Sequence, residues 1–247
     1  MRETSTGRNR TGIQAASSDL RRAMEDVTEL TPVDANDGSL AATRAEFAEE
    51  SDDNVGSIPP PPTLKGMVKS AVGALSGESV AELLDRLSQR LAFERSGSRY
   101  YEGLITKFKV AQAANMIPDG GPTLDDLVRF HDDEMRHFAL LKTAIEDLGG
   151  DPTVQTPAAD VAAVTGMGIG PVINDPRTDF WQALEAILVA ELTDNDSWDM
   201  LIQVVAGLGY DDLATRFTVA KTDEDEHLSN VRIWLQQHAM RQAGAST

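Results

Sequence analysis

Two short stretches decide what this chain can fold into: Asp133-Glu134-Met135-Arg136-His137 and Asp223-Glu224-Asp225-Glu226-His227. Each places a glutamate three residues before a histidine, inside a long segment whose apolar residues recur at helical spacing. Residues i and i+3 share one face of a helix, so each stretch can present a carboxylate and an imidazole to the same point. The two stretches therefore predict two helices that each contribute a Glu and a His to one site.

Two further segments each carry a glutamate in the middle of an apolar stripe. The apolar spacing predicts four long helices, over residues 79–115, 123–148, 177–207 and 211–240. Glu94 interrupts the stripe of the first helix, and Glu191 interrupts that of the third. Glu94 precedes Glu134 by 40 residues and Glu191 precedes Glu224 by 33, which indicates a weak internal duplication. Two such helix pairs would bring four glutamates and two histidines together.

Four carboxylates inside a helical protein need neutralisation. Two carboxylates about 5 Å apart repel each other by roughly 3 kcal/mol at an effective dielectric constant of about 20. Two divalent cations would balance the four charges, and carboxylates with imidazoles are ligands that suit iron and manganese. We therefore predict a site for two iron ions, or for Mn/Fe or Mn/Mn, with these ligands: Glu94, Glu134, His137, Glu191, Glu224 and His227.

The composition excludes several other classes of protein. The chain has no cysteine, so disulfides and thiolate-bound metals are excluded. Its net charge of −18 argues against nucleic acid as a partner, because phosphates attract Lys and Arg. No apolar run approaches the roughly 18 residues of a membrane helix, and the N-terminus lacks the apolar core of a secretory signal. The sequence thus predicts a soluble, cytoplasmic protein without membrane contact.

Composition also predicts three regions along the chain. Residues 1–58 form an acidic tail that is expected to be largely disordered. Residues 59–78 combine the prolines at 59–62 with a short amphipathic helix, and residues 79–247 hold the four long helices. Residues 151–176 are too long for a hairpin loop, and about 3.3 Å per residue lets them cross the full length of the helices.

The metal stretches resemble those of bacterioferritin and the wider ferritin-like family. The likeness covers residues 85–240 and includes the 33-residue spacing from Glu191 to Glu224. It implies an all-α, ferritin-like four-helix bundle with one long crossover, and a homo-oligomer that is a dimer or larger. It also implies dioxygen or peroxide as the co-substrate.

The resemblance also implies a role for each site residue. Glu94 and Glu191 correspond to terminal ligands, Glu134 and Glu224 to bridging ligands, and His137 and His227 to nitrogen ligands. Asp133 and Asp223 correspond to residues that hydrogen-bond the opposite histidine and fix its tautomer. Tyr101 matches a tyrosine beside the iron site that can supply an electron. Met135 matches the haem-ligand position, but a surface or interface methionine is the favoured interpretation, so no haem is expected.

Some positions stay open between two interpretations. Asp194, three residues after Glu191, is either a hydrogen-bonding neighbour of the site or a solvated acid. Gly97 and Ser98, one turn after Glu94, either leave space for a small substrate or allow close helix contact. Trp198 and Trp234 are interpreted as core residues, and His131 as a polar residue at the core edge.

Three classes of function remain. The favoured one is oxidation of Fe(II) by dioxygen or hydrogen peroxide, in iron handling or defence against oxidative stress. The first alternative is a di-iron oxygenase or oxidase, which predicts a tunnel lined by Gly97, Ser98 and apolar neighbours. The second is a metal-binding cargo protein that docks to a partner through its N-terminal tail. Fold cannot decide between them.

Overall fold

The computed structural model describes residues 40–50, 58 and 80–244. Contacts divide the chain into two units, Met1–Pro59 and Pro60–Thr247. In the first unit, α2 (Leu40–Glu50) is a helix inside the segment that composition predicts to be disordered. The rest of that tail and the predicted short helix after the prolines lie outside the described residues.

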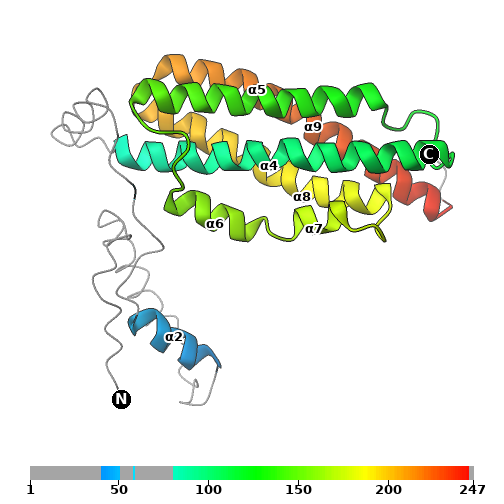
Figure 1. Cartoon of the computed structure of the whole chain (residues 1–247), viewed down its shortest axis with the longest axis horizontal. Coiled ribbons are helices and arrows are strands. Elements are labelled where there is room, and N and C mark those ends of the chain that lie inside the picture. Colours follow the sequence, from blue (N-terminus) through cyan, green and yellow to red (C-terminus); the bar gives the residue numbers. More distant parts are fainter. Residues whose placement is uncertain (1–39, 51–57, 59–79, 245–247) are drawn as a thin grey trace. The chain divides into compact units, whose positions relative to one another are not determined.

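The second unit confirms the prediction of an all-α protein, because all regular structure in its described residues is helical. Its long helices are α4 (Val80–Ala113), α5 (Leu124–Leu148), α8 (Phe180–Gly207) and α9 (Asp211–Gln242). Helices α4 and α5 pack as one pair and α8 and α9 as another, while α4 contacts α8 and α5 contacts α9 (Figure 1). Each helix lies within a few residues of its predicted range.

The helix ends follow from local sequence signals. Thr123 caps α5 by accepting a hydrogen bond from the backbone N–H of Asp126, whose carboxylate accepts from the backbone of Thr123 in return. Gly149 closes the same helix in the left-handed conformation, at φ 89°. Helix α8 begins three residues later than predicted because Asp179 caps it, in a capping box with Gln182. Arg177 instead lies in the preceding turn, where Asp175 binds both its backbone and its guanidinium.

The crossover between α5 and α8 contains two short helices, α6 (Pro157–Thr165) and α7 (Ile169–Asn174). Both contact α4, so the crossover runs along that helix (Figure 1). The N–H of Ala158 donates to the buried Asp85 carboxylate on α4, which ties the start of α6 to the helix. Apolar periodicity did not indicate these helices, since each is too short to show it.

The core consists of two apolar clusters with a polar layer between them. In α4, for example, the buried apolar residues from Val80 to Leu91 belong to one cluster, and those from Tyr101 onwards belong to the other. The buried apolar residues of α5, α8 and α9 are likewise divided between the two clusters near the middle of each helix. Glu94 lies at this level in α4, and Glu191 lies there in α8. The four helices therefore hold their buried glutamates in one layer, with apolar side chains packed on both sides of it.

Hydropathy sets one further limit on the fold. Of the helices described, none has both the length and the apolar character needed to traverse a bilayer.

Candidate metal centre

The structure brings all six predicted ligand residues into the polar layer. Helices α4 and α8 contribute one glutamate each, and α5 and α9 contribute one Glu-x-x-His stretch each. The six side chains are at most 3% exposed: Glu94, Glu134, His137, Glu191, Glu224 and His227. Burying four carboxylates without compensating charge is strongly unfavourable, so their common position requires an explanation.

The candidate ligand atoms form three overlapping groups that share Glu224, one of which joins it to Glu94, Glu134 and Asp194. Atoms of Glu94, His137 and Glu224 lie within 4.8 Å of one another, and so do atoms of Glu134, Glu191, Glu224 and His227. Glu224 Oε1 lies 2.7 Å from His137 Nδ1, whereas its Oε2 lies 3.4 Å from His227 Nδ1. One carboxylate thus turns one oxygen towards each histidine, so Glu224 would be able to hold an ion on each side.

Among the described residues, the atoms that face this centre have no hydrogen-bond partner outside the cluster, within which His137 Nδ1 lies 2.7 Å from Glu224 Oε1. The atoms are Nδ1 of both histidines, Oε2 of Glu94, Glu134 and Glu191, and both oxygens of Glu224. Buried polar atoms in proteins are normally paired, so several unpaired atoms around one point indicate a missing binding partner. Four carboxylates and two imidazoles are a donor set suited to two divalent ions such as iron or manganese. The residues therefore fit the predicted pair of metal ions.

Both histidines are held in the orientation that metal binding needs. His227 Nε2 lies 3.1 Å from Asp133 Oδ2, and His137 Nε2 lies 3.3 Å from Asp223 Oδ2. Each aspartate thus comes from the other Glu-x-x-His helix. A proton on Nε2 donates to the carboxylate and leaves the lone pair of Nδ1 pointing to the centre. The reciprocal pairing predicted for Asp133 and Asp223 is present.

Electrostatics show that the site retains protons when no cation is present. Burial raises the pKa of Glu134 well above its ordinary value, and the charges of Glu224, Glu94 and Glu191 raise it further. Burial likewise raises the pKa of Glu191 to about 8. Burial lowers the pKa of His137, but the close carboxylates of Glu224 and Glu94 outweigh this effect and raise it to about 9. Metal ions would take the place of these protons.

These pKa values predict that the metal-free protein loses stability as the pH rises. Glu191 and His137 bind protons more tightly when folded, because their pKa values rise from 4.5 to about 8 and from 6.5 to about 9. The unfolded chain loses these protons first, so the free energy of unfolding falls between about pH 5 and 9. We expect the melting temperature to drop by roughly 5–10 °C from pH 5.5 to 8.5. Calorimetry on chelator-treated protein measures this, and saturating Mn(II) should remove the drop.

Two neighbours of the ligands occupy defined positions beside the centre. The Tyr101 hydroxyl donates to Glu191 Oε1 at 2.5 Å, and burial raises the pKa of Tyr101 well above its ordinary value. Asp194 is 2% exposed, and one of its carboxylate oxygens lies within 4.8 Å of atoms of Glu94 and Glu224. Asp194 is therefore a buried neighbour of the site and not a solvated acid.

Sequence reasoning missed Arg90. Its guanidinium is buried, donates to Glu94 Oε1 at 2.5 Å and also binds Asp194 Oδ1. Phe93 and Trp198 flank it, with ring centroids 4.8 and 5.6 Å from the guanidinium carbon. The available signal was its position one turn before Glu94, between two leucines that are also buried.

The remaining residues singled out in the sequence are not ligand candidates in the structure: some lie near the surface or in the apolar core, and others pack beside the centre. His131 contacts Asp132 and Glu102 near the surface, and Met135 is 48% exposed. Trp234 is a core residue, and Trp198 packs edge-on against His137. Gly97 and Ser98 are buried, and Gly97 faces the carboxylate of Glu134. The space beside Gly97 is thus filled by a proposed ligand.

Comparison of the chain with protein-family models, with curated proteins and with solved structures finds no match. Function must therefore be inferred from the geometry of the site.

Proposed function

We propose that the chain forms a ferritin-like four-helix bundle whose six clustered side chains bind two divalent metal ions, and that it oxidises Fe(II) with dioxygen or hydrogen peroxide. The observation that carries the proposal is the set of buried, unpaired ligand atoms, with both histidines oriented by aspartates. An ordinary core would not leave five carboxylate oxygens and two imidazole nitrogens facing one another with no partner outside their own cluster.

The electron balance of this reaction is simple. Two Fe(II) ions give up two electrons, which with two protons reduce dioxygen to hydrogen peroxide or hydrogen peroxide to two waters. When bound, the ions would supply open coordination positions for the oxidant.

Residues of the chain would bind the two ions and transfer protons and electrons during this oxidation. Glu134 and Glu224 would hold both ions, and Glu94 and Glu191 would each hold one of them. Asp223 is about one-third exposed at its side chain and binds His137, so it connects the centre to solvent. Tyr101 is placed to supply an electron, because its hydrogen bond to Glu191 gives its proton an acceptor.

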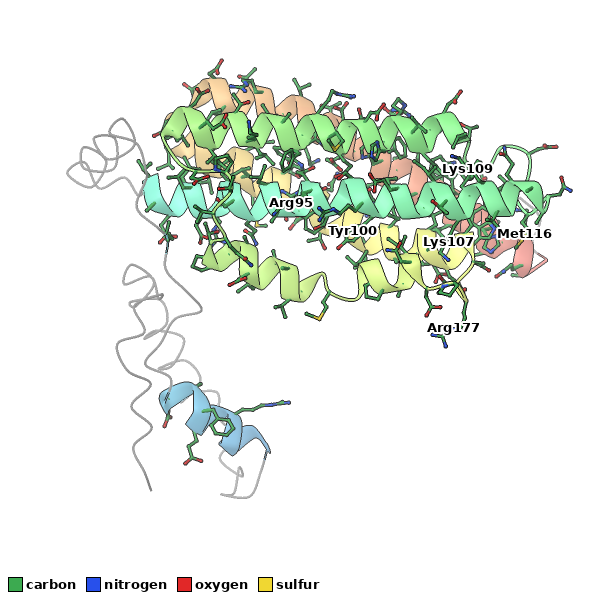
Figure 2. All side chains as sticks on the ribbon, in the orientation of Figure 1. Arg95, Tyr100, Lys107, Lys109, Met116 and Arg177 are labelled. Atoms are coloured by element: carbon green, nitrogen blue, oxygen red, sulfur yellow. The ribbon has the colours of Figure 1, made fainter. Side chains whose placement is uncertain are left out.

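The contacts of Gly97 and the surface grooves favour Fe(II) over an organic substrate. The predicted substrate tunnel would be lined by Gly97 and Ser98, but the Glu134 carboxylate occupies the space beside Gly97. A groove of about 430 Å³ lies between α4 and the crossover, where Arg95 and Tyr100 line it (Figure 2). No proposed ligand lines this groove or the three others described, of about 360, 460 and 420 Å³. The groove of about 460 Å³ lies between α8 and α9, where Asp196, Asp225 and Arg232 line it.

The cargo alternative concerns the tail, of which the structure describes only residues 40–50 and 58, so the tail-docked partner stays a prediction. The homo-oligomer, the cytoplasmic location and the choice between iron and manganese also stay predictions.

Turnover of Fe(II) tests the proposed reaction. Fe(II) is first added stepwise to metal-free protein in the absence of oxygen. Oxygen is then admitted, and the amount of Fe(II) oxidised per chain is measured by absorption. We expect rapid oxidation that continues well beyond two Fe(II) per chain, and at least a 100-fold slower rate in Glu191→Gln. Glu185→Gln, on the exposed side of the same helix, should behave like the wild type. Oxidation that stops at two ions would favour the oxygenase alternative.

A further inference from the structure

The two halves of the proposed centre differ in the donor that binds their terminal glutamate. Glu94 Oε1 accepts a hydrogen bond from the Arg90 guanidinium, and Glu191 Oε1 accepts one from the Tyr101 hydroxyl, both at 2.5 Å. In both glutamates Oε2 is unpaired and turned to a histidine, 3.6 Å from His137 Nδ1 and 3.9 Å from His227 Nδ1. The halves therefore match in layout, but one donor is a cation and the other is neutral.

The guanidinium of Arg90 is held in this position by its surroundings. Arginine stays protonated in proteins, and this side chain is 4% exposed and enclosed by Phe93 and Trp198. Asp194 binds the same Nη2 atom that donates to Glu94. The pair fixes the guanidinium against Glu94, whereas Tyr101 offers Glu191 a single neutral hydroxyl.

We infer that Arg90 makes the two metal positions unequal, so that the half formed by Glu94 and His137 binds its ion second and more weakly. This inference rests on the proposed two-metal site. A guanidinium hydrogen bond draws negative charge towards itself and is about twice as strong as a neutral one. Glu94 is consequently the poorer donor to a cation. The half formed by Glu191 and His227 has no such cation bound to its terminal glutamate.

Stepwise binding of Co(II), without any turnover, tests this inference. Titration calorimetry and visible absorption follow the binding of Co(II) to metal-free protein. We expect two ions per chain, with dissociation constants at least tenfold apart. Arg90→Gln should tighten only the weaker constant by about tenfold or more, and Tyr101→Phe should alter only the tighter one.

If the single variant does not fold, a double variant, Arg90→Gln with Asp194→Asn, replaces it in the same titration. The double variant removes both charges of the ion pair. It should also bring the two constants together. Arg86→Gln, one turn earlier on the exposed side of α4, should leave both constants unchanged. An arginine with a merely structural role would lower the melting temperature without changing the ratio of the constants.

The outcomes separate this inference from the proposed function. Two equal constants in the wild type, or a ratio unaffected by both Arg90 variants, would overturn the role of Arg90 and leave the two-metal site intact. Failure of the wild type to bind any Co(II) would overturn both.

Discussion

Two equivalents of Mn(II) or Fe(II), added without oxygen, should raise the melting temperature of the metal-free protein by roughly 10–20 °C. An ion present at about 100 times its dissociation constant stabilises the folded state by about 2.7 kcal/mol, so two ions contribute about 5 kcal/mol. In a domain of this size each kcal/mol corresponds to roughly 2–4 °C. The increase is large because the buried glutamates of the metal-free protein must either keep protons or repel one another, and bound ions remove both costs. Differential scanning calorimetry with and without a chelator measures it.

The matched variants for this test lie in one stretch. Glu224→Gln keeps the size of the side chain but removes the charge that faces both histidines, so the metal-dependent increase should fall to a few degrees or less. Glu226→Gln, two residues later, removes only a surface ion pair with Arg129, for which at most about 1 kcal/mol is expected. It should retain the full increase. A wild-type protein whose melting temperature ignores Mn(II) and Fe(II) would contradict the metal centre.

Helix positions and the residues of the centre could be predicted because they depend on local pattern. A Glu-x-x-His stretch places both side chains on one face whatever the rest of the chain does. Glu94 and Glu191 were recognisable because a charged residue in an apolar stripe must point into the core. The capping residues Thr123 and Gly149 likewise mark the ends of α5 through their own backbone chemistry.

The features that were missed depend on contacts between distant segments. Arginines usually lie at the surface. The burial of Arg90 depends on its ion pair with Asp194, which is 104 residues away in the sequence. The same contact decides between the two interpretations of Asp194. Helices α6 and α7 are held by packing on α4, so they show little periodicity of their own. The role of Gly97 depends on where the Glu134 side chain points, which no spacing rule reveals.

Gly97→Ala should weaken metal binding at least 100-fold while leaving the fold nearly as stable as the wild type. A Cβ at this position would lie 2.6 Å from Glu134 Cδ and closer still to its Oε2, so the Glu134 carboxylate has to swing away. Moving the end of one side chain costs the fold little, and replacing a helical glycine with alanine contributes about 1 kcal/mol in its favour. Glu134 is a proposed bridge, so its displacement should weaken the binding of both ions.

A second glycine on the same helix supplies the matched control for this last prediction. A Cβ at Gly103 would lie 2.7 Å from Ile173 Cγ2, where it disturbs the packing of α7 and touches no proposed ligand. Gly103→Ala should therefore lower the melting temperature and keep the wild-type affinity for Co(II), which is the reverse of the result expected for Gly97→Ala. Equal metal affinity in the two variants would show that the space beside Gly97 does not hold a ligand. The opposite responses of two alanines, six residues apart on one helix, would show that the Glu134 carboxylate beside Gly97 is part of the metal centre.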